Sequence, residues 1–205
     1  MLDKSIREFT ELSASKAPVP GGGGVSALVG SLAASLAEMV TNLTTGKKKY
    51  AEYEEEIQRI MKETDELRIS LLNCVNEDAE AFEPLAKAYS MDKNDPDYAD
   101  NMEKCLKTAA GAPLHILQLC CRVVELDERL AIIGSKLAVS DAATSVMLAH
   151  GAIYGAFINI KVNTRLMKDR EHAVELEDKA AEMLQEYGER ALKCYRSVEK
   201  RLSNG

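Results

Sequence analysis

The apolar residues of this chain recur every three or four positions over nearly its whole length, which is the spacing of one face of an α-helix. Ala, Leu, Glu and Lys are abundant, and these side chains lose little rotamer freedom in a helix. Aromatic residues make up only 5% of the 205 residues, and no segment has the alternation expected of a strand. The pattern predicts an all-α fold and excludes an all-β one.

The periodicity predicts six helical segments that form one domain over residues 1–205, a bundle of long helices. We expect Pro84 to kink or end the third segment and Pro113 to kink the fourth. The second and fifth segments are rich in Ala and Gly and have apolar surface on most sides, so we expect a homodimer with one of them at the interface. The expected helices cover about residues 2–12, 25–45, 50–89, 102–133, 136–162 and 168–202.

Charge and cysteine content exclude several kinds of partner and compartment. A net charge of −7 argues against a general nucleic-acid binder. The stretch Val25–Ala37 is shorter than the roughly 20 apolar residues that a membrane span needs, and the first ten residues have no signal-peptide core. The five cysteines form no CxxC pair, which fits a reducing compartment. We expect a cytoplasmic protein without a membrane or nucleic-acid partner.

The segment Pro18–Gly24 is the most unusual feature, with two prolines followed by four glycines just before a predicted helix. Free backbone N–H groups at a helix N-terminus favour anions or developing negative charge. We therefore take Pro20, Gly21, Gly22 and Gly23 as candidate substrate-binding residues. The alternative is a flexible connection between helices.

Two aspartates stand out by position as candidate catalytic residues. Asp78 falls on the apolar stripe of its helix, so its carboxylate is paired, shifted in pKa or lining a cavity. Asp141 follows Ser140 near the start of the fifth segment, where a plain helix-terminal acid is the alternative. Ser140 and Asn159 are candidate substrate-binding residues. Asn159 is 18 residues, or five turns, after Asp141 and points the same way, roughly 27 Å along the helix, so a long ligand or two distinct sites would be needed to use both.

The run Lys47–Lys49 follows Gly46 at a junction between two helices of an otherwise acidic chain. Three lysines here are either a solvated loop or a collector for a carboxylated ligand. No P-loop, GxSxG, HExxH or zinc-type Cys/His spacing is present in the sequence. We therefore expect no metal site and no cofactor, and an enzyme of this kind would work with carboxylates, amides, lysines and backbone.

Four segments, taken together and in this order, are similar to the cyclodeaminase/cyclohydrolase family. This family includes the cyclodeaminase half of formiminotransferase-cyclodeaminase and free-standing methenyltetrahydrofolate cyclohydrolases. The resemblance extends over essentially the whole chain, and its first two segments are the most specific. The segments are PGGG at residues 20–23, LTTGKKKY at 43–50, DAEAF at 78–82 and SD at 140–141.

The resemblance implies a helical fold, a dimer formed through long helices, and a folate that binds near the dimer interface. It implies an enzyme that forms or hydrolyses the N5,N10-methenyl bridge of tetrahydrofolate, with ammonia release in the cyclodeaminase and water attack in the cyclohydrolase. Neither reaction needs a metal or redox cofactor. Any formiminotransferase would be a separate protein. The alternative is a helical scaffold that binds folate or a partner without turnover.

Overall fold

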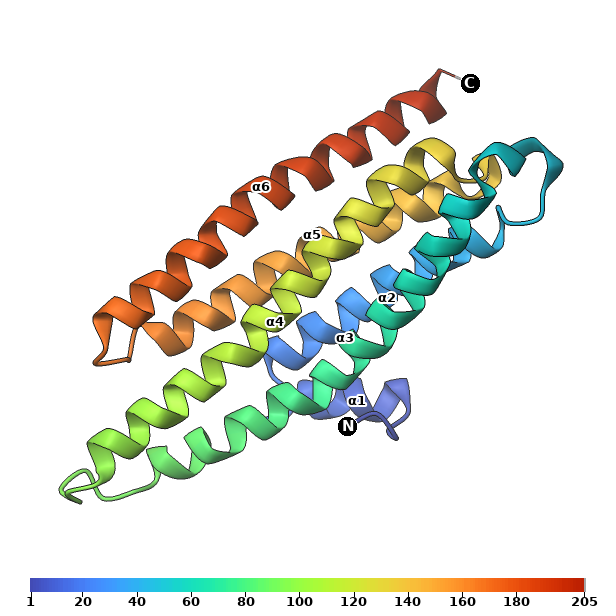
Figure 1. Cartoon of the computed structure of the whole chain (residues 1–205). Coiled ribbons are helices and arrows are strands. Elements are labelled where there is room, and N and C mark those ends of the chain that lie inside the picture. The colour runs from blue at the N-terminus through green and yellow to red at the C-terminus, as the bar shows by residue number, and fades with distance from the viewer. Residues whose placement is uncertain (205) are drawn as a thin grey trace.

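The computed structural model of the chain describes residues 1–204, and this part of the chain is helical without a strand (Figure 1). Short connections join the long helices, so consecutive helices run antiparallel. The prediction of an all-α bundle is confirmed. The elements are α1 (Ile6–Ser13), α2 (Gly22–Asn42), the 3₁₀ turn η1 (Lys48–Tyr53), α3 (Glu54–Tyr89), α4 (Tyr98–Ile133), the 3₁₀ turn η2 (Lys136–Ala138), α5 (Val139–Thr164) and α6 (Arg170–Ser203).

The core lies where four helices meet. Helix α2 packs against α3, α4 and α5, while α6 covers α4 and α5 from the outside. Small side chains on α2 and α5, such as Ala33 and Ala152, are fully buried and allow close helix contacts. The N-terminus of α2 lies midway along the bundle, whereas the turns after α2 and α4 lie together at one end (Figure 1).

The structure corrects two expectations about helix boundaries. Gly22–Gly24 are not a loop but the first turn of α2, with Gly21 as its N-cap. Of the two outcomes expected at Pro84, an end of the helix is wrong, because α3 continues to Tyr89, while a kink stays a prediction. The buried side chains of Leu85 and Ala88 join a separate small core with α4, and this packing holds the last turn in place despite the hydrogen bond that proline removes.

The expectation that the longest apolar stretch is too short to cross a membrane is wrong by length and composition, because three segments are long and apolar enough: α2, α4 and Lys136–Thr164. In the bundle these helices pack against one another, with 56%, 56% and 44% of each apolar stretch buried. The remaining apolar surface includes Leu32, 51% exposed on α2, and Ile158, 56% exposed on α5.

Candidate active site

Helix α2 begins with three glycines. Because they have no side chains, residues of other helices can contact the backbone of its first turn. Gly21 caps the helix without any side-chain hydrogen bond. Each glycine in a helix costs about 1 kcal/mol relative to alanine. Glycine is required at position 23, because a Cβ there would overlap the carboxylate of Asp78.

Asp78 reaches this helix end from α3 and packs directly on the backbone of Gly23 and Gly24. Burial raises the pKa of Asp78, and a hydrogen bond from the N–H of Gly24 opposes that shift. No cation of the described chain contributes to its pKa. The result is a half-buried carboxyl group near a helix N-terminus, without a neutralising partner.

Asn159 reaches the same place from α5. Its Nδ2 lies so close to Gly22 that a Cβ there would come within 2.7 Å of it. One N–H of the amide donates to Gly155 O at 2.7 Å, which sets the orientation of the side chain. Asn163, one turn later, donates to Ala109 O at 3.1 Å and so links α5 to α4.

These groups surround a cavity of about 110 Å³ at the junction of α2, α3, α4 and α5. That volume accommodates part of a ring system rather than a whole folate. Its lining combines one carboxyl group, two amides, bare helix backbone and an aromatic ring. The lining residues are Pro18, Val19, Gly21, Gly22, Gly23, Asp78, Phe82, Ala109, Pro113, Asn159, Val162 and Asn163.

The structure brings together the predicted residues Gly21, Gly22, Gly23, Asp78 and Asn159, and Pro20 is buried just before them. Sequence reasoning did not name Phe82 and Asn163 as site residues. The sequence did contain a signal for both. Phe82 follows Asp78 by four residues and Asn163 follows Asn159 by four, so each lies about one helical turn from a candidate and on the same face of its helix.

Lys47–Lys49 and Ser140–Asp141 lie at a different place, the end of the bundle where α2 and α4 terminate. The two turns there are joined, because Ser135 N donates to Thr44 Oγ1 at 2.8 Å and Lys136 N donates to the Tyr50 hydroxyl at 3.0 Å. The 21 residues of α2 separate this end from the cavity by roughly 30 Å. One small ligand cannot touch both groups within a single chain.

A second carboxyl group, Asp127 on α4, is fully buried in the centre of the bundle. Ser145 Oγ is 2.7 Å from Asp127 Oδ2 and 2.7 Å from Ala33 O. Burial raises the pKa of Asp127 well above its ordinary value. A neutral Asp127 that donates from Oδ2 to Ser145, while Ser145 donates to Ala33 O, satisfies these two contacts and leaves Asp127 Oδ1 without a hydrogen-bond partner among the described residues.

Comparison with known proteins connects this architecture to folate enzymes. Methenyltetrahydrofolate cyclohydrolase of Methylorubrum extorquens is 34% identical over 98% of this chain and 99% of its own length. Formimidoyltransferase-cyclodeaminase of Mus musculus is 26% identical over 98% of this chain, which spans only 38% of that longer protein.

A solved structure gives the same result for the fold. The crystal structure of formiminotetrahydrofolate cyclodeaminase from Thermotoga maritima superposes with a TM-score of 0.84 at 31% identity, covering 99% of this chain and 98% of that one. A family profile described as formiminotransferase-cyclodeaminase matches residues 5–182. With most of its length matched by that profile, the chain belongs to the formiminotransferase-cyclodeaminase family.

Proposed function

We propose that the chain is a folate one-carbon enzyme that acts on the N5,N10-methenyl bridge of tetrahydrofolate, as a methenyltetrahydrofolate cyclohydrolase. The end-to-end match with the Methylorubrum extorquens cyclohydrolase supports this assignment. The structural observation that carries it is Asp78, a half-buried carboxyl group that has no cationic partner among residues 1–204 and faces a cavity beside the N-terminal backbone of α2.

The methenyl carbon lies between two nitrogens and carries a delocalised positive charge. In the cavity the Asp78 carboxylate supplies the missing opposite charge, and limited water access strengthens their attraction. Substrate charge in turn favours the ionised form of Asp78, opposing the rise in pKa that burial causes.

The same carboxylate can move the protons of the reaction. Water adds to the methenyl carbon and gives one proton to Asp78, and a tetrahedral adduct forms. The bond between N5 and this carbon then breaks, N5 takes the proton from Asp78, and the carbon becomes the formyl group on N10. The second proton of the water leaves to solvent as the carbonyl forms. Because burial raises the pKa of Asp78, its pKa lies nearer to neutral pH, where a group exchanges protons efficiently.

A formimidoyltetrahydrofolate cyclodeaminase is the second candidate, favoured by the Thermotoga maritima structure of that name. Here N10 attacks the formimidoyl carbon on N5 and loses its proton, and ammonia leaves after its nitrogen is protonated. Asp78 is placed for the same proton transfers. We propose that a separate formiminotransferase would supply this substrate.

Purified protein offered both substrates tests the proposal. Loss of methenyl absorbance faster than the spontaneous rate supports the cyclohydrolase. Ammonia release with growth of methenyl absorbance supports the cyclodeaminase instead. Folate binding without either reaction would overturn both and leave the binding scaffold.

We propose further that the active form is a homodimer paired along α2 and α5. Val25, Leu32 and Met39 are exposed apolar residues spaced seven apart on α2. A two-fold axis at Leu32 would set Val25 against the Met39 of a second copy, which makes the stripe self-complementary. Light scattering that shows a monomer at micromolar concentration would overturn the dimer.

Such an antiparallel dimer would join the two separated groups of predicted residues. The end that carries Lys47–Lys49 and Ser140–Asp141 in one copy would approach the Gly21–Gly23 cavity of the other. The lysines could then attract the glutamate carboxylates of a folate, and Asp141 could serve the reaction across the interface. This arrangement supports the predicted roles of those residues without requiring one chain to span roughly 30 Å.

Mixing two inactive variants tests the shared site. Asp78→Asn and Asp141→Asn are co-refolded in equal amounts, so that half the dimers are mixed and each mixed dimer has one intact site. Activity should recover to roughly a quarter of wild type. No recovery, with each variant folded and dimeric, would contradict the arrangement.

We propose a cytoplasmic location for the enzyme.

A further inference from the structure

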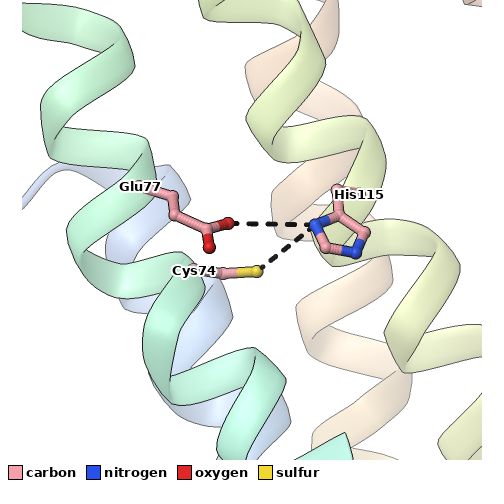
Figure 2. Close-up of side chains that lie close together, drawn as sticks. All are labelled: Cys74, Glu77 and His115. Carbon is pink, nitrogen blue, oxygen red and sulfur yellow. Dashed lines mark hydrogen bonds and ion pairs between the residues drawn. The ribbon is translucent and has the colours of Figure 1, made fainter.

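A second cluster of side chains that could bind a ligand lies between α3 and α4, and none of its residues lines the cavity. Cys74 and Glu77 of α3 and His115 of α4 point toward one another (Figure 2). Cys74 Sγ is 3.7 Å from His115 Nδ1, and Glu77 Oε2 is 3.9 Å from the same nitrogen. All three potential ligand atoms lie within 4.8 Å of one another.

These separations are close to those around a tetrahedral zinc ion. Zinc bonds of about 2.3 Å to sulfur and about 2.0–2.2 Å to nitrogen and oxygen place neighbouring ligand atoms roughly 3.3–3.6 Å apart. The two distances to His115 Nδ1 therefore need to shorten by about half an ångström or less, and the Cys74 sulfur and the Glu77 oxygen, which lie within 4.8 Å of each other, need to approach by at most about 1.3 Å. Glu77 and His115 have side chains 53% and 52% exposed and can make that adjustment, while Cys74 is held in the core at 1% exposure.

We propose that Cys74, Glu77 and His115 bind one zinc ion, with the fourth position open to water. A thiolate and an imidazole favour zinc and similar transition metals, whereas magnesium and calcium prefer an all-oxygen set. Burial raises the pKa of Cys74 to about 12, so the thiol is protonated without metal and gives its proton to solvent as the sulfur–zinc bond forms.

The ion would clamp α3 to α4 beside the cavity. Asp78 follows Glu77 directly, and Pro113, which lines the cavity, is two residues before His115. Holding these helices together would stabilise the fold. The site stands on its own ligand geometry and does not depend on the reaction proposed above.

Titration of the purified, metal-free chain with Co²⁺ tests the site, because cobalt replaces zinc and reports its ligands by absorption. We expect one equivalent of Co²⁺ to produce a sulfur-to-cobalt charge-transfer band and intense visible bands of tetrahedral cobalt. Zn²⁺ should bleach both bands, and Zn²⁺ alone should raise the Tm. Absence of the charge-transfer band in the wild-type chain would overturn the proposal.

Variants locate the ion. Cys74→Ser should abolish the charge-transfer band, and His115→Gln and Glu77→Gln should each weaken metal binding at least tenfold. His115 and Glu77 are half-exposed, so their variants should fold even if Cys74→Ser does not. Glu80→Gln, one turn further along α3, and Cys105→Ser are the matched controls and should bind as wild type. Binding that survives His115→Gln and Glu77→Gln unchanged would place the metal elsewhere and overturn the site.

Discussion

Asp78 and Asp127 are both aspartates whose pKa burial raises, yet their surroundings differ in one respect that matters for chemistry. Asp78 faces a cavity and bare helix N–H groups, so a ligand can reach it. Asp127 is enclosed among α2, α4 and α5 with Ser145 as its side-chain partner. A raised pKa therefore indicates that a carboxyl group is buried. Whether a ligand can reach that group decides whether it can react or only stabilises the core.

The sharpest test of this difference is Asp78→Asn. The amide keeps the size of the carboxyl group but can neither carry charge nor take a proton, so kcat/KM should fall by about 10²–10⁴-fold. The Tm should change little. Turnover and thermal melting are measured on the same sample, and a normal rate per folded molecule would remove Asp78 from the mechanism.

Gly23→Ala tests whether the bare helix end positions Asp78. The new methyl group would overlap the carboxylate and push it from the cavity, and a displacement of about 1 Å can cost roughly 10²-fold in rate. Gly111→Ala is the matched control, because nothing lies within 4 Å of its Cβ position. That variant should keep full activity and gain up to about 1 kcal/mol in free energy of unfolding. Equal activity in both variants would contradict the positioning role.

Asp127→Asn should affect stability and not turnover. The folded-state pKa of Asp127 is raised, so its contribution to stability is complete below the ordinary aspartate pKa and is lost as pH rises toward the folded pKa. Over that range this one group makes the free energy of unfolding fall by about 1.4 kcal/mol per pH unit. Urea unfolding at several pH values should show this slope as the difference between wild type and the variant, because all other titrating groups contribute equally to both. A fall in activity per folded molecule would instead make Asp127 functional.

The smallest effect is expected for Lys47→Ser, Lys48→Ser and Lys49→Ser combined, because the three lysines are exposed and lie beyond the opposite end of α2 from Asp78. Binding of polyglutamylated folate should weaken a few-fold, more at low salt than at high salt, and monoglutamylated folate should be affected less. The measurement is the Kd for both folates at two salt concentrations. Equal losses for both tail lengths would contradict a role in tail binding.

Much of the candidate site was readable from local sequence. Asp78 stood on an apolar stripe, and the four glycines stood where a helix was expected to begin, so both could be singled out before any contact was known. Phe82 and Asn163 could be predicted only from their positions one helical turn after other candidate residues. Asp127 was missed although it stands on the buried stripe of α4, as Asp78 does on α3. Nothing local indicates its partner Ser145, 18 residues later.

Sequence alone determined that the chain forms long helices, because helical periodicity and propensity are local properties repeated over many residues. It also indicated which residue types could carry chemistry. Tertiary structure decided which of them meet: the packing of α2, α3 and α5 places Gly23, Asp78 and Asn159 at one cavity, and leaves Lys47–Lys49 and Asp141 at the far end. It also places Cys74 beside His115, 41 residues away, a pairing that no search for local metal-ligand spacing could find. Contacts between helices depend on how side chains interlock across the core, and this is a property of the whole fold rather than of any one segment.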